Sequence, residues 1–189
     1  MKKQKKNLKQ VFALILLILP TFVFSQNWTV RESRDEMTDE MTVYVISTEV
    51  MPTKPMSFPY EDTKSSLCIG ITKDSIWVYF WFSSEPNISN RKYDENYTDP
   101  IVDTRVKFDK DIETNRFIIT GDSFINVPNK EYFLKRLLES KEFLLELEWY
   151  GSGSGSVYFR YNLEGLYEAL VEGCTKTGNT TYKVSETVK

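Results

Sequence analysis

The sequence contains no histidine, only two cysteines in 189 residues, and no apolar run long enough to span a bilayer. Without histidine, the chain cannot form a Ser-His-Asp or Cys-His nucleophile pair, an HExxH zinc site or a His-ligated haem. The absence of histidine therefore excludes most familiar hydrolases and metalloenzymes. The remaining composition, 41% hydrophobic and 27% charged, is typical of one globular domain with a substantial core.

The longest apolar run is short and lies near the N-terminus. Residues 11–24 are apolar apart from Thr21 and follow five lysines among the first nine residues. A basic stretch followed by a short apolar run is typical of a secretory signal peptide. The run contains Pro20 and falls short of the roughly 20 residues that span a bilayer, which disfavours a retained anchor. We expect residues 1–25 to be a cleaved signal peptide and the protein to be periplasmic or secreted.

Removal of this segment makes the chain strongly acidic. The five leader lysines are accompanied by no acidic residue, so their loss changes the formal net charge from −3 to −8. A protein of that charge repels phosphate backbones and anionic lipid. We therefore expect no nucleic-acid partner and no membrane association after signal cleavage.

Alternation of apolar and polar residues dominates the first two thirds of the mature chain, and two helical patterns follow. Short segments rich in Val, Ile, Tyr, Phe and Trp, separated by turn residues, indicate strands. We expect eight strands, at residues 28–32, 41–50, 67–71, 76–82, 102–108, 116–120, 143–149 and 157–161. The Gly/Ser stretch 151–156 joins the last two as a hairpin tip, because strand patterns flank it on both sides.

The hairpin of strands 67–71 and 76–82 predicts two apolar faces. Pairing Ile71 with Ile76 gathers the aliphatic residues of both strands on one face, which must be core. The opposite face is also too apolar to leave in water, since it carries Cys68, Gly70, Trp77, Tyr79 and Trp81.

A C-terminal amphipathic helix is the expected cover for this second face. With Asn162 as its N-cap, the helix has an apolar stripe of Leu163, Leu166, Tyr167, Leu170, Val171 and Cys174. Docking it over Trp77, Tyr79 and Trp81 brings Cys174 towards Cys68. If the three rings stay uncovered, they instead form a platform on which sugar rings stack.

An exported chain with two cysteines favours a disulfide, because the compartment is oxidising. We therefore expect a bond between Cys68 and Cys174, which would contribute about 4 to 5 kcal/mol in the chain-entropy model. Two separate buried thiols are the alternative.

A second, shorter helix is expected at residues 130–139. The domain spans residues 26–175, and 176–189 form a flexible tail.

Two long loops, 51–63 and 83–100, are candidates for function, since loops of this length in compact domains often carry it. They and one outward-facing strand residue supply four candidate binding residues: Arg91, Tyr93, Tyr97 and Arg105. Arg105 can instead make a cross-strand ion pair, the more usual arrangement on a strand.

Acidic pairs are the main remaining source of chemistry, and two carboxylates facing one cleft could hydrolyse a glycosidic bond. Solvated surface is the more expected reading of such pairs in an acidic chain. The acidic run 109–113 has calcium-loop spacing at its start, but Thr114 and Thr120 stand where that loop needs Gly and Glu. We expect no catalytic residue, no metal and no cofactor.

Several short motifs resemble the bacterial exported TagO-like proteins. They are Trp28, the polar stretch 33–39, Leu67-Cys68-Ile69, Arg105-Val106-Lys107-Phe108-Asp109, and Phe159-x-x-Asn162-Leu163-x-Gly165-Leu166-x-x-Ala169-Leu170 running to Cys174. The resemblance spans nearly the whole mature chain. It implies a periplasmic accessory role associated with type VI secretion and supplies no catalytic residue.

The sequence thus predicts a mainly β protein, an antiparallel β-sandwich or sheet with two α-helices, the second packed on the sheet and held by the disulfide. We expect an exported, non-enzymatic accessory or binding protein of the bacterial envelope, whose partner is an envelope protein or cell-wall glycan. The alternatives are a carboxylate-dependent cell-wall glycosidase and an exported protein-inhibitor module. An exposed apolar patch on the two long loops would indicate the inhibitor.

Overall fold

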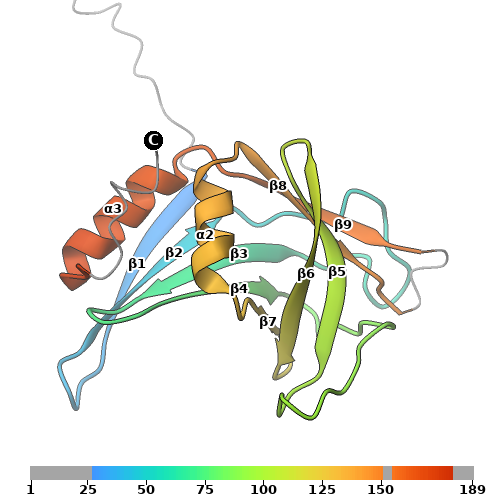
Figure 1. The fold of residues 1–189 in the computed structure, drawn as a ribbon, viewed down its shortest axis with the longest axis horizontal. Helices are drawn as coiled ribbons and strands as arrows, with labels where there is room; N and C mark the ends of the chain where they lie inside the picture. Colours follow the sequence, from blue (N-terminus) through green and yellow to red (C-terminus); the bar gives the residue numbers. More distant parts are fainter. Residues whose placement is uncertain (1–26, 151–154, 181–189) are drawn as a thin grey trace, which may run out of the picture.

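The part of the protein that the structure describes is mainly β, as predicted, with one antiparallel sheet and two helices (Figure 1). The computed structural model describes residues 27–150 and 155–180, so the predicted signal peptide lies outside it. The sheet order is β1-β2-β3-β4-β7-β6-β5-β8-β9. The elements are β1 Trp28–Arg34, β2 Met41–Ser47, β3 Ser65–Ile71, β4 Ile76–Phe82, β5 Ile101–Phe108, β6 Asp111–Thr120, β7 Phe124–Asn126, α2 Lys130–Leu138, β8 Glu142–Leu147, β9 Val157–Asn162 and α3 Leu166–Thr177.

The β3–β4 hairpin has the predicted register. Ile71 pairs with Ile76 and Leu67 with Phe80, and the aliphatic residues of both strands are buried on one face. All eight predicted strands are present. The ninth, β7, has only three residues and was not predicted, yet it joins β4 to β6.

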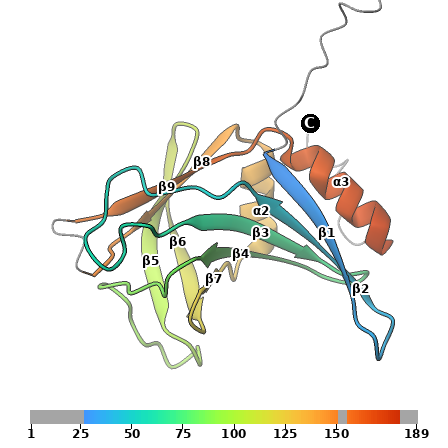
Figure 2. The same cartoon turned by 180° about the vertical axis from the view of Figure 1, so that it is seen from behind.

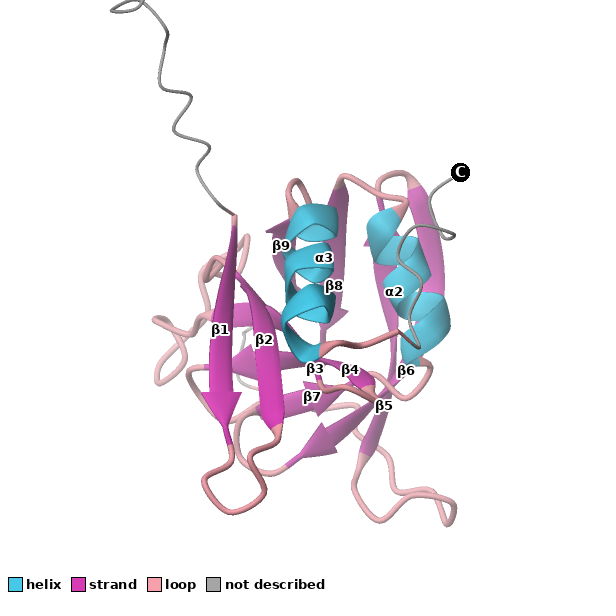
Figure 3. Cartoon of the chain, turned by 90° about the vertical axis from the view of Figure 1, so that its left-hand side faces the viewer, coloured by secondary structure: helices cyan, strands magenta, loops and turns pink. Residues whose placement is uncertain are grey.

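The sheet curls until its β9 end meets the chain that follows β2. Val50 forms an antiparallel bridge with Ser65 of β3, and Pro52 forms one with Phe159 of β9. Backbone hydrogen bonds support both contacts, including one of 2.8 Å from the Thr53 amide to the Tyr158 carbonyl. Strands β3 to β9 and this segment therefore surround one interior, and the β1–β2 hairpin extends from β3 (Figure 3).

Aromatic side chains fill that interior. Phe80 of β4 packs on Phe143 of β8 with ring centroids 5.7 Å apart, and Phe82 packs on Phe159 at 5.3 Å. Burying each such ring contributes roughly 1.5 to 3 kcal/mol. Tyr161 is fully buried, with its hydroxyl 2.7 Å from Ser65 Oγ. The interior is thus a packed core, and ligands must bind outside it.

Helix α2 covers one side of this core close to the predicted position. Phe133 inserts among the rings of β4, β5, β6 and β8, with centroids 5.4 Å from Phe108 and 5.9 Å from Phe117. Seen from behind, β2, β3 and β4 pass in front of α2 (Figure 2). The outward face of these strands therefore points away from this helix.

Helix α3 packs on the sheet as predicted, but on the aliphatic face. It contacts β1, β2 and β3, and a Cβ added at Gly173 would lie 2.7 Å from Ile71 Cδ1 and 3.4 Å from Val43 and Val45. These three residues share the face of Leu67. The prediction that α3 covers Trp77, Tyr79 and Trp81 is therefore wrong.

The rotation of α3 explains the error. The buried stripe includes Ala169 and Gly173, whereas Tyr167 and Val171 are 38% and 39% exposed. The helix begins at Leu166 after Gly165, which has a positive φ of 85°, so Asn162 is not its N-cap. Small residues on the buried side let the helix approach β2 closely.

The predicted disulfide is also wrong, because the two cysteines lie on opposite faces of the sheet. Cys174 is on the side of α3 that meets the aliphatic face, and Cys68 points to the other face. Both are buried free thiols. Burial raises the pKa of Cys68 to about 12 and also raises that of Cys174, which keeps both thiols protonated and unreactive.

The chain beyond the predicted domain boundary at residue 175 is partly in the fold. Helix α3 continues to Thr177, and Asn179 is buried with its amide 2.7 Å from the Thr72 carbonyl. The long loops are also anchored. Met56 and Ile88 are buried, and Ile88 bridges to Trp149.

We predict that reducing agents leave the stability of the protein unchanged. Alkylation of the unfolded, unreduced protein should add two labels, and the melting temperature with and without dithiothreitol should agree. Mass spectrometry and thermal denaturation measure these outcomes. Labelling of the unfolded protein only after reduction would contradict the placement of Cys68 and Cys174 on opposite faces.

We predict that Gly173→Leu destabilises the protein by about 1 to 3 kcal/mol, because a larger side chain must displace Ile71 or move α3 off the sheet. Leucine is a good helix former, so helix propensity opposes rather than causes the loss. Urea denaturation measures the effect. Val171→Leu, on the exposed side of the same helix, is the matched control and should have little effect.

Candidate functional site

The most distinctive surface is a group of large rings on the outward face of the sheet. It comprises Tyr44 on β2, Trp77, Tyr79 and Trp81 on β4, and Phe124 on β7, which we call the aromatic strip. Strand alternation places these side chains opposite the buried core residues. The first four are half-buried and Phe124 is 40% exposed, so the strip meets solvent.

The strip is held together by contacts between strands. The ring centroids of Tyr44 and Trp77 are 6.3 Å apart across β3, and those of Tyr79 and Phe124 are 5.6 Å apart, both in edge-to-face geometry. Glycine is required between the first two rings, because a Cβ at Gly70 would lie 2.1 Å from the Trp77 indole. The indole thus occupies the space above Gly70.

A buried thiol lies beneath the centre of the strip. Cys68 pairs with Tyr79 across β3 and β4, and its thiol donates a 3.7 Å hydrogen bond to the Ser66 carbonyl. Burial, followed by the neighbouring thiol, raises the pKa of Tyr79 well above its usual value. The phenol therefore stays neutral at physiological pH, and the centre of the strip has no charge.

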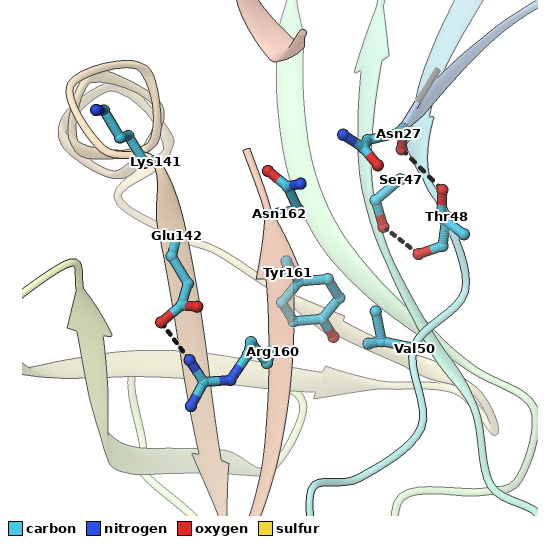
Figure 4. Close-up of a pocket in the computed structure, with 9 residues that line it drawn as sticks. All are labelled: Asn27, Ser47, Thr48, Val50, Lys141, Glu142, Arg160, Tyr161 and Asn162. Carbon is cyan, nitrogen blue, oxygen red and sulfur yellow. Dashed lines mark hydrogen bonds and ion pairs between the residues drawn. The ribbon is translucent and has the colours of Figure 1, made fainter. Parts of the chain in front are cut away.

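A separate cleft of about 520 Å³ opens between β9 and the end of β2 (Figure 4). Its walls are Asn27, Ser47, Thr48, Val50, Lys141, Glu142, Arg160, Tyr161 and Asn162. Glu142 is the one carboxylate in this lining, and its Oε1 lies 2.5 Å from Arg160 Nη1. A glycosidase needs two carboxylates across one cleft, which this lining does not provide.

The acidic run 109–113 forms a hairpin turn whose carboxylates bind groups of the protein itself. Asp109, with φ of 51°, accepts hydrogen bonds of 3.0 Å from the Lys141 and Glu142 amides. Asp111 and Glu113 bind Arg136 of α2. Within residues 27–150 and 155–180, no group of three or more acidic or cysteine side chains is placed to hold a metal ion.

The predicted loop residues differ in exposure. Tyr93 is 77% exposed and Arg91 is exposed, whereas Tyr97 is half-buried. On the loop 51–63, Phe58 is 85% exposed and Met51 is 53% exposed.

Arg105 makes the cross-strand ion pair that the sequence left as an alternative. Its Nε and Nη2 lie 2.6 and 2.7 Å from the two Glu146 carboxylate oxygens, and the Tyr158 hydroxyl donates a 3.3 Å hydrogen bond to the same carboxylate. The Glu146 side chain is 11% exposed. Hydrogen bonding by Arg105 lowers the pKa of Glu146 despite this burial.

Comparison with known proteins found no family model, curated protein or solved structure that matches the chain. Among the helices in the described part of the chain, none is long and apolar enough to cross a membrane.

Sequence reasoning identified part of the aromatic strip. Alternation placed Trp77, Tyr79 and Trp81 on one face, but Tyr44 and Phe124 were not included. Tyr44 could have been added by extending the pairing to β2. Phe124 lies on a strand too short to give an alternation signal.

We predict that Arg105→Met makes stability less sensitive to acid. A carboxyl whose pKa is lowered on folding stabilises the fold above its unfolded pKa and loses that contribution as pH falls through the folded pKa. Without Arg105, the pKa of Glu146 is no longer depressed, so the free energy of unfolding should fall less between pH 7 and pH 3 than in the wild type. Urea denaturation at both pH values measures this, and an unchanged difference would contradict it.

Proposed function

We propose that this protein is an exported, non-enzymatic accessory or binding protein of the bacterial cell envelope that holds its ligand on the aromatic strip. The signal-peptide pattern at residues 1–25 and the resemblance to TagO-like proteins support export and an accessory role. The same resemblance supports an association with a secretion system. Two free, protonated thiols and the absence of histidine favour binding over nucleophilic catalysis.

One observation carries the proposal: five large rings lie together at the surface on a sheet face that neither α2 nor α3 contacts. Contiguous apolar surface of this kind in a monomer commonly marks an interaction site. The residues are also fixed, because they project from paired strands and contact one another. A preformed site loses less conformational entropy on binding than a loop does.

The glycosidase alternative has weaker support. The described cleft offers Glu142 alone, and that carboxylate is paired with Arg160. The inhibitor alternative predicts a contiguous apolar patch on the long loops, where three large apolar residues, Met51, Phe58 and Tyr93, are exposed, fewer than the five rings of the strip.

We predict that the exported protein sediments with purified cell-envelope fragments without releasing soluble fragments from them. Phe124→Ala should weaken the apparent affinity for the fragments at least about tenfold, which corresponds to about 1.4 kcal/mol of binding free energy. Co-sedimentation and assay of the supernatant for released saccharide measure both outcomes.

The matched control is Tyr167→Ala, because Tyr167 on α3 is 38% exposed against 40% for Phe124. It should leave retention unchanged. Release of soluble saccharide would replace the proposal with the glycosidase, and loss of retention in Tyr93→Ala but not in Phe124→Ala would move the site to the loop.

A further inference from the structure

We propose that the ligand of the aromatic strip is an uncharged polysaccharide chain of the envelope. This inference rests on the proposed function and specifies the chemistry of the same surface. It follows from the charge, the polar groups and the shape of the outward sheet face.

The outward positions of β2, β3, β4 and β7 carry no charged side chain. They are Thr42, Tyr44, Ile46, Ser66, Cys68, Gly70, Trp77, Tyr79, Trp81, Phe124 and Asn126. This is unusual in a chain with 27 acidic and 24 basic residues. The nearest outward cation is Arg31 of β1, which pairs with Tyr44 of β2. On β6 and β5 the same face carries Arg116, which is paired with Asp103, and other charges such as Lys73 and Asp122 lie in turns at the strand ends.

This charge pattern disfavours the other large ligands. A phosphate polymer or an anionic lipid surface would need several cations, whereas the nearest ones are Arg31 and Arg116, the second already paired with Asp103. A charged protein partner would find no complementary charge to fix its orientation. Binding of an uncharged chain to this surface has no desolvation cost from ionised groups, because neither partner has one there.

The side chains on the face match the two surfaces of a sugar ring. Aromatic rings can stack against its C–H groups, while the hydroxyl of Thr42 and the amide oxygen of Asn126, whose Nδ2 donates to Thr120 Oγ1, can bond its hydroxyls.

The shape of the strip fits a polymer better than a small molecule. Neighbouring strands lie about 4.8 Å apart, so the three steps from Tyr44 on β2 to Phe124 on β7 span about 14 Å. Trp77 and Trp81 lie about 14 Å apart along β4 by the same geometry. The strip is an open surface rather than part of the cleft, and several rings in sequence suit a ligand with repeated sugar units.

Sedimentation of the exported protein with defined polysaccharides tests the proposal. The probes are chitin and cellulose, which are uncharged, and calcium-gelled alginate, which is anionic. We expect retention by at least one uncharged polymer and none by alginate. Retention should be unchanged between 0.05 and 0.5 M NaCl, because no ion pair contributes to binding. Trp81→Ala and Phe124→Ala should each lower it at least tenfold, and Tyr167→Ala should not.

The other outcomes overturn the proposal in distinguishable ways. Retention by alginate alone, or retention lost in 0.5 M NaCl, would show that the ligand is charged. Equal retention of wild type, Trp81→Ala and Phe124→Ala would place glycan binding elsewhere. If no uncharged polymer is bound while envelope fragments still retain the protein through Phe124, the ligand is not a glycan and the proposed function stands. If envelope fragments also fail to retain it, both proposals fail.

Thermal denaturation confirms that each variant is folded. If Trp81→Ala does not fold, Phe124→Ala, at the edge of the strip, tests the proposal by itself.

Discussion

The register of the β3–β4 hairpin determines what each side of this protein can do. With Ile71 opposite Ile76, Phe80 and Phe82 point into the core while Tyr79 and Trp81 point outward. A slip by one residue would exchange the two faces. The inward rings pack against β8, β9 and α2, and this packing curls the sheet and closes it through the segment after β2. The outward rings remain on the face where neither α2 nor α3 packs.

Local pattern was sufficient for much of the fold. Strands, the hairpin register and both helices follow from alternation and helical spacing, which depend on residues close in sequence. The side of the sheet that α3 covers could not be read in this way, because both faces of β3 and β4 are apolar. Packing decided it: Gly173 and Ala169 allow close approach to Val43 and Val45, whereas bulky Tyr167 and Val171 stay outside. The disulfide was inferred from docking α3 on the sheet face that carries Cys68, so it fails for the same reason.

The candidate site was predictable only in part, and again the limit is contact between residues distant in sequence. Trp77, Tyr79 and Trp81 share one strand, so alternation groups them. Tyr44 and Phe124 join them through pairing of β2 with β3 and of β4 with the three-residue β7. Arg105 shows the reverse case. Its outward position was correct, but Glu146 lies 41 residues away and binds it through both oxygens, which explains Arg105 without a ligand.

Stability alone does not account for the composition of the aromatic strip. A solvent-facing strand position is satisfied by Thr or Lys, which keep the surface soluble without exposing rings. Here the Trp77 indole leaves room only for glycine at position 70, and glycine weakens a strand. A smaller side chain at position 77 with a β-branched residue at position 70 would avoid this loss of stability. The edge-to-face contacts offset part of this cost but leave the rings half-exposed. A face that combines rings, neutral polar groups and no carboxylate on an acidic protein is better explained by binding than by folding.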